Sequence, residues 1–408
     1  MKILFLGYWG YRDALTASTV FPHLAVLQAR PDVEHIRLVT IERGADALDP
    51  PALALPFAHP RISFEPLCSP PGRSVLVTKT DDFRRFPRLL QQQAASFGAD
   101  CLIARGTPAG SLAYLVWRRT GLPFYVESFE PHAQYMREGG VWGRFDPRYL
   151  FQRHWERMQK KHARGLMPVA ERYRRHLIDD EGLDPEKIAT IPCSVDAAAF
   201  GFSAPARARV RGALGYADEC VVGVYAGKFG GIYYDAEAFG LFRRAADFFG
   251  PAFRLLLLSP QPEAALRAKL AAAGVSQAQV AVRFVAFGEV PDYLAAADFA
   301  FNLHRPTPFV SPVKIGEYWA NGLPVLLPPG IGDDSDIVVA EGGGAVFDLN
   351  QPGSVATALG RVAALVQEPG GRARIHGLAV RHRSPARARE AYAALLPAAA
   401  PARSAAAA

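Results

Sequence analysis

The chain has 408 residues, of which half are apolar and 21% are charged, and this composition is that of a globular protein long enough for two domains. Its four cysteines are far apart and form no C-x-x-C pair, which argues against a zinc ribbon or a disulfide framework and favours a reducing compartment. The N-terminal apolar run meets Gly7 too soon for a signal peptide, and no run approaches the ~20 residues of a membrane span, so we expect a cytoplasmic protein.

The first half of the chain alternates short apolar runs with amphipathic segments. Lys2 to Gly7 is typical of a buried strand, and a glycine-containing loop from Gly7 to Arg12 separates it from a helix that begins near residues 16 to 19. This order is typical of a mononucleotide-binding unit, although the G-x-x-G spacing alone is a weak signal. Further strands are predicted at 36–41, 101–104, 124–127, 165–169 and 188–192, and further helices at 82–97, 108–120 and 148–164.

A second series of the same kind begins at Cys220. Strands are predicted at 220–226, 255–258, 282–286, 299–303 and 323–327, and helices at 235–249, 263–273, 292–297, 333–340, 355–367 and 384–396. We therefore predict an α/β protein with two doubly wound parallel-sheet domains, at residues 1–200 and 201–380, facing each other across a cleft. The helix at 384–396 is a candidate to pack back on the first domain, and the Pro- and Ala-rich tail 397–408 is expected to be disordered.

The stretch from Ser311 to Leu327 predicts a loop, a short helix, a tight stop and a buried strand. Ser311 suits an N-cap and Pro312 the first helical position, and Asn321-Gly322 supplies a left-handed stop. Lys314 and Glu317, three residues apart, project from one face. Together with the unpaired amides of the first turn they can hold an anion and a hydroxylated group. The alternative is a solvated surface pair, but the strand-to-helix junction of an α/β sheet is where such folds bind ligands.

Lys228 follows the first strand of the second half directly. It lies between Gly227 and Gly230, and a lysine in a glycine-rich turn after a strand favours contact with phosphate. The alternative is a surface residue in a flexible turn.

The net charge of +7 is concentrated in one region. Between Arg144 and Arg175 there are ten Lys or Arg residues and three acids. The predicted helix within it interleaves Tyr149, Leu150, Phe151, Trp155 and Met158 with bases, which is compatible with peripheral contact with an anionic membrane. A helix with its apolar side on the core and a solvated basic face is equally compatible. No recognition motif for nucleic acid accompanies the charge.

Several motifs together resemble those of the retaining nucleotide-sugar glycosyltransferases of the GT-B fold, in particular family four, the group 1 glycosyltransferases. They are Glu317-Tyr-Trp-Ala-Asn-Gly-Leu-Pro-Val, Ile191-Pro-Cys-Ser-Val-Asp196 with Phe200, Tyr225-Ala-Gly-Lys228, Phe284 to Gly288 and Val290 to Asp298. They occur in the expected order over most of residues 190 to 330. The resemblance implies a transfer of a sugar from a UDP- or GDP-sugar to an acceptor hydroxyl, with retention and without a metal or other cofactor.

The resemblance also implies roles for residues of the second domain. Glu317 is expected to bind the ribose hydroxyls, and the backbone around Phe287 and Gly288 is expected to meet the base. Lys228 and the amides at Ser311, Pro312, Val313 and Lys314 are expected to hold the diphosphate, where they can stabilise the charge of the leaving group.

For the first domain the resemblance implies an acceptor-side loop and a histidine near the donor sugar. Gly7, Tyr8, Trp9 and Gly10 fit the loop, and His132 fits the histidine by position, with a polar loop histidine as the alternative. Glu127 and Glu130 are close enough in sequence to be rival acid or base candidates.

Two positions depart from the family pattern. Phe309 stands where the family has a carboxylate that binds the donor sugar, although a Pro-x-Lys variant like Pro312-Val-Lys314 also occurs among relatives. The Tyr233-Tyr234 pair replaces a second basic residue after Lys228. These departures leave two alternatives: a sugar-nucleotide-binding protein or partner subunit that has lost catalysis, and a metal-dependent transferase that uses Asp334 and Asp336 as ligands, although these residues also suit a helix start.

Overall fold

The computed structural model describes residues 1–69 and 75–397 and divides the chain into two compact units. The first unit contains Met1–Gln134, Gly143–Ser194 and Pro385–Ala408, and the second contains Tyr135–Trp142 and Val195–Ser384. The chain therefore passes from one unit to the other after Gln134, Trp142, Ser194 and Ser384. Neither unit is one continuous piece of chain.

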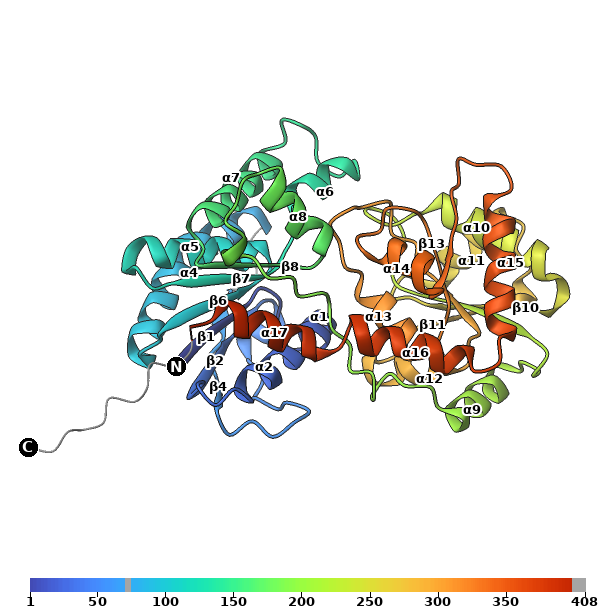
Figure 1. The fold of residues 1–408 in the computed structure, drawn as a ribbon, viewed down its shortest axis with the longest axis horizontal. Coiled ribbons are helices and arrows are strands. Elements are labelled where there is room, and N and C mark those ends of the chain that lie inside the picture. The colour runs from blue at the N-terminus through green and yellow to red at the C-terminus, as the bar shows by residue number, and fades with distance from the viewer. Residues whose placement is uncertain (70–74, 398–408) are drawn as a thin grey trace, which may run out of the picture. The chain divides into compact units, whose positions relative to one another are not determined.

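The first unit is built on a six-stranded parallel sheet with the order β4-β2-β1-β6-β7-β8. Its strands are β1 (Lys2–Gly7), β2 (His35–Val39), β4 (Ile62–Phe64), β6 (Cys101–Arg105), β7 (Phe124–Phe129) and β8 (Gly165–Pro168), and β3 (Ile41–Glu42) pairs separately with β5 (Leu67–Cys68). The helices are α1 (Ala14–Thr19), α2 (Phe21–Gln28), α3 (Ala45–Leu48), α4 (Val75–Phe97), α5 (Thr107–Thr120), α7 (Pro147–His162), α8 (Glu171–Asp179) and α17 (Pro385–Leu395), while α6 (His132–Glu138) spans a crossing between the units. Figure 1 shows helices on both faces of this sheet.

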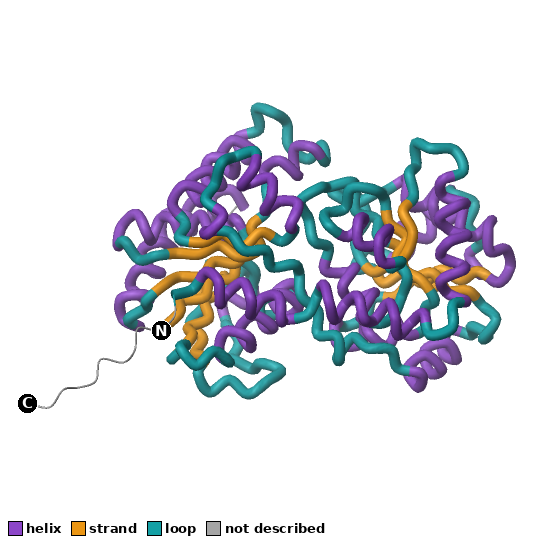
Figure 2. Tube along the Cα trace, in the orientation of Figure 1, coloured by secondary structure: helices purple, strands orange, loops and turns teal. Residues whose placement is uncertain are grey.

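The second unit repeats this plan with the order β11-β10-β9-β12-β13-β14, again parallel throughout. Its strands are β9 (Val221–Ala226), β10 (Phe253–Leu258), β11 (Val280–Arg283), β12 (Phe299–Phe301), β13 (Val325–Leu327) and β14 (Gly344–Val346). Its helices are α9 (Ala204–Leu214), α10 (Ala236–Phe249), α11 (Glu263–Ala272), α12 (Val290–Ala295), α13 (Val313–Ala320), α14 (Asp334–Glu341), α15 (Ser354–Gln367) and α16 (Gly371–His382). Figure 2 shows the strands of each unit inside a layer of helices. The prediction of two doubly wound α/β units is confirmed.

The central strands are mostly apolar, as suits strands that helices cover on both faces of each sheet. Ile3, Leu4, Phe5 and Leu6 of β1 are all fully buried, as expected for a parallel strand. In both sheets the strand order reverses beside the first strand, between β1 and β6 and between β9 and β12. Ligands of doubly wound sheets bind at the carboxyl ends of the strands at this reversal. The fold therefore singles out the loops that follow β1 and β9.

Helix α17 packs on α2 within the first unit, although it follows the whole second unit in sequence. Tyr392 is fully buried, and its hydroxyl lies 2.8 Å from Nδ1 of His23 on α2. This contact fixes the C-terminal helix to the N-terminal sheet. The tail predicted at 397–408 lies outside the described residues apart from Pro397.

Two parts of the secondary-structure prediction are wrong. The strand predicted at 188–192 is absent: Ile188 forms only an isolated bridge with Leu166, and Pro192 has no N–H to extend a ladder. The strand predicted at 282–286 lies at Val280–Arg283 instead. Helices α8, α9 and α16 were not predicted. The arginine- and alanine-rich sequences of α9 and α16 carry little apolar periodicity, whereas α8 is amphipathic, with Tyr173 and Leu177 buried four residues apart, and was missed.

Candidate functional site

Three loops at the carboxyl edge of the second sheet form one connected surface. The loop after β9 joins the loop after β12 through the bond from Tyr234 N to Leu303 O, at 2.8 Å. The loop after β12 joins the loop after β13 through the bond from Thr307 N to Gly330 O, at 3.0 Å. Because these loops surround the reversal of strand order, they are the natural place for a ligand in this unit.

Lys228 stands on a loop that the backbone holds firmly. Gly227 N donates to Leu258 O at 2.9 Å, Phe229 N donates to Oε1 of Gln261 at 2.9 Å, and the Tyr225 hydroxyl donates to Lys228 O. Gly230 has φ +88°, a conformation that a side chain would strain. The Lys228 side chain is exposed and has no hydrogen bond or ion pair with the described residues. A fixed backbone therefore presents a free ammonium at the edge of the sheet.

Helix α13 begins one residue later than predicted. Its N-cap is Pro312, and no side chain caps the helix. The prediction that Ser311 is the N-cap is wrong, because the Ser311 hydroxyl accepts a hydrogen bond from the buried guanidinium of Arg383. Val313 and Lys314 thus start the helix with no capping side chain at their amides, and such amides are suited to an anion.

Lys314 and Glu317 face each other on α13. Lys314 Nζ donates to Oε2 of Glu317 at 2.8 Å, the Glu317 side chain is 2% exposed and that of Lys314 is 36% exposed. The next residue, Tyr318, accepts a hydrogen bond from Ala226 N at 2.9 Å through its hydroxyl. Because Ala226 ends β9 two residues before Lys228, this bond holds α13 and the Lys228 loop together.

Phe287 and Gly288 lie in a short 3-10 helix, Phe287–Glu289, that leads into α12. The Phe287 ring packs against the apolar core, with its centroid 5.7 Å from that of Phe200. A Cβ on Gly288 would meet nothing within 4 Å, so its backbone is open to approach. Phe309, at the position expected for a carboxylate, is partly buried against the same core.

In the first unit, the loop from Gly7 to Gly10 is held by groups that the sequence did not reveal. Glu42, fully buried, accepts a hydrogen bond from Tyr11 N at 2.9 Å through Oε1. A Cβ on Gly10 would lie 2.9 Å from Oε2 of Glu42, so a side chain there would displace the carboxylate. The only sequence signal for Glu42 is a carboxylate placed directly after an apolar strand.

The side chains of Tyr8 and Trp9 are also held in place. The Arg43 guanidinium donates to Tyr8 O at 3.2 Å and lies 4.8 Å from the centroid of the Tyr8 ring. The Trp9 ring lies against Gly106, where an added Cβ would be 3.6 Å from it. The loop from Gly7 to Gly10, which was predicted to face the acceptor, is thus fixed from both sides.

Glu127 lies inside the first unit in a network with His23 and Arg105. Arg105 Nη1 lies 3.2 Å from Oε2 of Glu127 and 3.2 Å from Nε2 of His23, and Nδ1 of His23 lies 3.3 Å from Oε1 of Glu127. Burial lowers the pKa of His23. Burial also raises the pKa of Glu127, but His23 and Arg105 outweigh it and hold the pKa below its ordinary value. Glu127 is therefore a fully enclosed carboxylate at the end of β7.

His132 opens α6, close to two carboxyl groups whose pKa values are raised. Its backbone N–H donates to Glu130 O at 2.8 Å. Burial raises the pKa of Glu130 to about 7. Burial likewise raises the pKa of Glu156 to about 7, against the bond that its Oε1 accepts from Ala133 N at 2.9 Å. Glu156 comes from α7, so only the folded chain brings it beside the His132 loop.

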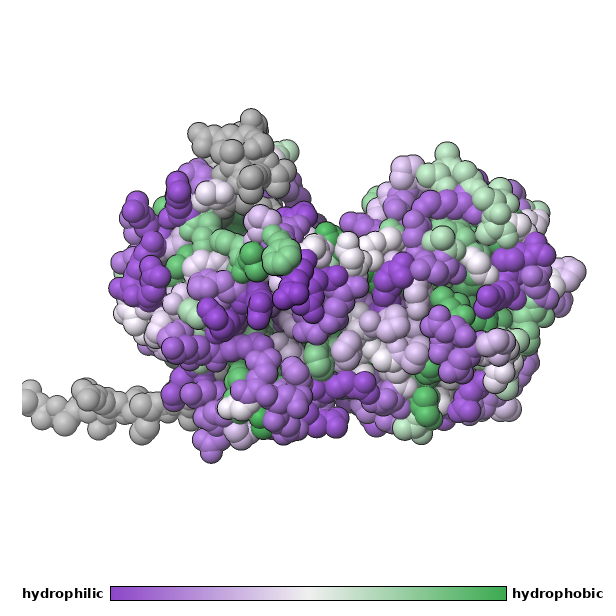
Figure 3. Space-filling model, turned by 90° about the horizontal axis from the view of Figure 1, so that it is seen from above, coloured by the Kyte–Doolittle hydropathy of each residue, from purple (hydrophilic) through white to green (hydrophobic). Residues whose placement is uncertain are grey.

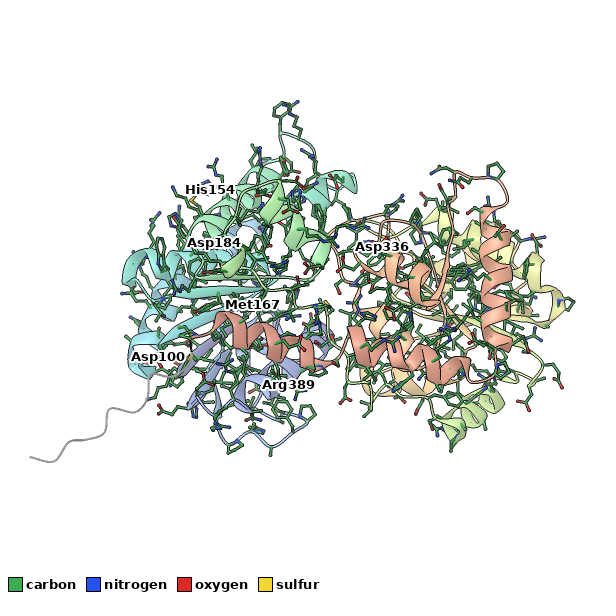
Figure 4. All side chains as sticks on the ribbon, in the orientation of Figure 1. Asp100, His154, Met167, Asp184, Asp336 and Arg389 are labelled. Atoms are coloured by element: carbon green, nitrogen blue, oxygen red, sulfur yellow. The ribbon has the colours of Figure 1, made fainter. Side chains whose placement is uncertain are left out.

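The hypothesis of a metal site at Asp334 and Asp336 meets a structural obstacle. Asp334 is 1% exposed and pairs with Arg383, so its carboxylate is occupied within the protein. Asp336 lies two residues further into α14 (Figure 4). Among the residues that the structure describes, no group of three or more His, Cys, Asp or Glu side chains could hold a metal ion.

Comparisons with known proteins agree with this architecture. Residues 15–194 match the family model described as the glycosyl transferase 4-like domain. HepE of Anabaena, solved in complex with UDP, has 15% identity and a TM-score of 0.68, with 96% of this chain and 98% of that one covered. Sucrose-phosphate synthase from Thermosynechococcus elongatus has 15% identity and a TM-score of 0.69, covering 97% and 96%.

WaaG, a glycosyltransferase involved in lipopolysaccharide biosynthesis, has 14% identity and a TM-score of 0.67, covering 95% of this chain and 98% of that one. HepE has also been solved with UDP and glucose and with UDP-glucose. A sequence search of the curated proteins found no match. Residues 15–194 therefore match a glycosyl transferase 4-like domain, and the chain as a whole has the two-sheet GT-B fold of these solved structures.

Proposed function

We propose that the protein transfers a sugar from a UDP- or GDP-sugar to an acceptor hydroxyl, in the synthesis of a glycan, polysaccharide or glycoconjugate. The observation that carries the proposal is the bond from Ala226 N to the Tyr318 hydroxyl, which joins the Lys228 loop to α13. A diphosphate there would meet the Lys228 ammonium and the amides of Val313 and Lys314. Glu317, one turn along α13, would accept hydrogen bonds from the ribose hydroxyls.

The chemistry of the leaving group favours such a site. As the glycosidic bond breaks, negative charge grows on the nucleoside diphosphate, and a positive charge placed in advance lowers the barrier. Lys228 and a helix N-terminus supply that charge, so the proposed reaction needs no divalent metal. We further propose that it proceeds with retention of configuration, as the sequence resemblance implies.

For the first unit we propose the acceptor side of the reaction. The loop from Gly7 to Gly10 ends β1 at the reversal of strand order and is held by Glu42 and Arg43. His132, the first residue of α6, would contact the donor sugar. Glu127 would act by fixing the end of β7, because its carboxylate has no exposed surface.

The decisive experiment combines binding and transfer. Calorimetry with UDP and GDP should show which base binds, and a transfer assay across UDP- and GDP-sugars should release the matching diphosphate. NMR of the product's anomeric proton then tests retention. If neither nucleotide binds and no sugar is transferred, the proposal fails.

One observation favours a second candidate, a sugar-nucleotide-binding protein or partner subunit with weakened catalysis. Phe309 packs against the apolar core where a carboxylate for the donor sugar is expected. Tight nucleotide binding without hydrolysis or transfer would support this candidate. Restored or raised transfer in a Phe309→Glu variant would locate the loss at that position.

We also propose peripheral contact of the protein with an anionic membrane, because α7 buries polar side chains and exposes apolar ones. Gln152, Glu156 and Gln159 are buried, and Gln159 Nε2 donates to Thr107 O at 2.9 Å. In contrast, Leu150 and Phe151 are 48% and 50% exposed. Figure 3 shows apolar side chains among hydrophilic ones on the first unit. Tyr149 is the apolar residue among the buried residues of α7, so the arrangement differs from a helix packed by an apolar side on a core.

Bases accompany these exposed apolar side chains. Arg153, Arg157 and Lys161 follow one another at steps of four residues, so they form a row along the exposed side of α7, where His154 (Figure 4) also lies. Phe145, just before the helix, is 80% exposed. We name Phe145, Leu150, Phe151, Arg153, Arg157 and Lys161 the α7 surface. Apolar side chains that insert and cations that attract suit an anionic bilayer.

Vesicle binding tests the α7 surface without any assay of transfer. Charge reversal of Arg153, Arg157 and Lys161 to Glu should weaken binding to phosphatidylglycerol-containing vesicles by at least ~100-fold, because the loss of three cations costs about 1 kcal/mol each and the new carboxylates add repulsion. The matched control reverses the exposed bases Arg244, Arg361 and Arg389 (Figure 4). Phe145→Ser should also weaken binding, unlike Phe284→Ser at a side chain that is 79% exposed in the second unit. Equal effects of test and control variants would refute the proposal.

A further inference from the structure

Two buried asparagines of the second unit differ in their hydrogen bonds. Asn321, at the end of α13, donates from Nδ2 to Phe200 O at 3.1 Å and to Pro291 O at 3.2 Å. Asn302, directly after β12, is 4% exposed, yet its Nδ2 has no hydrogen-bond partner among the described residues. Folded proteins pair nearly all of their buried amide groups, because an unpaired one costs free energy. The Asn302 amide therefore calls for a partner from outside the chain.

The strand register places Asn302 beside the end of β9. Asn302 N donates to Leu326 O at 2.9 Å, so the ladder between β12 and β13 continues to this residue. On the other side of β12, Ala300 pairs with Val224 of β9. The same register two residues further on sets Asn302 next to Ala226, the last residue of β9. The amide therefore lies at the reversal of strand order, where doubly wound sheets bind their ligands.

The Asn302 side chain lies on the face of the sheet that α13 covers. Side chains alternate along a strand, so Asn302 shares its face with Ala300 and not with Phe301. Ala300 packs in the same cluster as Ala226 and Tyr318 of α13. Phe301 packs instead in the cluster that contains the buried side of α10. The amide is therefore close to the bond from Ala226 N to the Tyr318 hydroxyl, which joins β9 to α13.

The other groups at this end of the sheet are suited to an anion. They are the ammonium of Lys228, two residues after β9, and the amides of Val313 and Lys314 at the start of α13. A neutral N–H donor beside them is suited to the same anion. Hydrogen bonds to a charged acceptor are roughly twice as strong as those between neutral groups, so a phosphate oxygen is a favourable partner for the Asn302 amide.

We propose that Asn302 is a further residue of the donor site and donates a hydrogen bond from Nδ2 to an oxygen of the bound nucleoside diphosphate. The inference deepens the proposed function and rests on it. In the free protein this amide is a buried donor without a partner in the chain, and the diphosphate supplies the acceptor. Loss of the amide should therefore lower the affinity for the nucleotide without lowering the stability of the free protein.

The test compares the same substitution at the two buried asparagines. Calorimetry measures the affinity for UDP or GDP, whichever the wild type binds, and thermal scans without nucleotide measure stability. Asn302→Ala should bind the nucleotide about tenfold more weakly, with a thermal midpoint within about 2 °C of the wild type. Asn321→Ala is the matched control. It leaves the carbonyls of Phe200 and Pro291 without their donor, so its midpoint should fall by about 4 °C or more while its affinity stays that of the wild type.

A second variant and a second ligand make the result specific. Asn302→Asp keeps the shape of the side chain but replaces the donor by a carboxylate that repels phosphate, so it tests the contact even if Asn302→Ala does not fold. Its affinity for the diphosphate should fall further than that of Asn302→Ala. The nucleoside without phosphates, uridine or guanosine, should bind to Asn302→Ala and to the wild type equally, because it lacks the proposed acceptor.

Three results would overturn the role of Asn302. Unchanged diphosphate affinity in both Asn302 variants would show that the amide does not contact the nucleotide. An equal loss of affinity for the nucleoside, or a loss confined to the nucleotide sugar, would place the amide at another part of the donor. A wild type that binds neither UDP nor GDP would instead overturn the proposed function itself. The two failures are thus separate observations.

Discussion

In the first unit, His23, Arg105 and Glu127 share one buried network, whereas in the second unit Lys228 and Lys314 keep exposed or partly exposed side chains at the carboxyl edge of the sheet. The two sheets have the same strand order, so the difference is not one of topology. Charges that neutralise each other inside a unit hold loops in place, and charges left at an edge can act on a ligand. Variants at these positions should therefore affect stability in one unit and binding in the other.

Breaking the buried network should have the largest effect. Arg105→Ala removes the cation and leaves the Glu127 carboxylate buried beside a neutral histidine, which costs about 3–5 kcal/mol of unfolding free energy. Urea unfolding followed by far-UV circular dichroism measures the loss. Arg148→Ala removes an arginine from an exposed pair with Asp146 and should change stability little. Equal losses of unfolding free energy in the two variants would mean that burial of the network does not contribute to stability.

Removing the free ammonium should change binding but not stability. Lys228→Gln deletes a charged donor worth roughly 1.5–3 kcal/mol, so UDP affinity should fall by about tenfold to a hundredfold. The thermal midpoint should stay within error, because the exposed side chain makes no hydrogen bond or ion pair with a described residue. Calorimetry and thermal scans of Lys228→Gln and of Lys187→Gln, an exposed control, check both parts. If Lys228→Gln binds UDP with unchanged affinity, Lys228 does not contact the diphosphate.

The raised pKa of Glu156 should make stability depend on pH. Its folded pKa of about 7 lies above the ordinary 4.5, so the folded state holds a proton that the unfolded state releases. The unfolding free energy therefore falls as pH rises from about 4.5 to 7, by up to ~1.4 kcal/mol per unit. Glu156→Gln cannot ionise and should be more stable than the wild type at pH 8 but not at pH 4.5. Melting curves of the variant and the wild type at both pH values measure this difference. If the stability of the two proteins changes equally with pH, the raised pKa of Glu156 is contradicted.

The smallest effect is expected from metal removal. With positive charge supplied by Lys228 and α13, EDTA should change the transfer rate by less than about twofold, and so should Asp336→Asn. A loss of activity on EDTA that added Mn²⁺ or Mg²⁺ restores would show that the second unit needs a cation after all.

Local sequence patterns were sufficient to predict the parts of the fold that depend on near neighbours. The strand at Lys2–Gly7 was predicted with its bounds, because apolar runs ended by glycine are specific to buried parallel strands. Lys314 and Glu317 were placed on one face of a helix by their spacing alone.

Contacts between residues far apart in sequence could not be predicted in this way. Arg383 takes the hydroxyl of Ser311 that otherwise suits a cap, and no local pattern connects the two residues. Glu42 and Glu156 reach their loops only through the arrangement of strands and helices. The segment Tyr135–Trp142 belongs to the second unit although the first unit surrounds it in sequence. These features are set by tertiary packing, which single-sequence periodicity does not encode.

The bond between His23 and Tyr392 bears on how the protein is made. A ribosome releases His23 early and Tyr392 almost at the end. The first unit therefore lacks α17 until translation is nearly complete. The unit encoded second can mature first. Truncation just before Pro385 should therefore destabilise the first unit, which contains the amino terminus, more than the second unit, which ends at the cut.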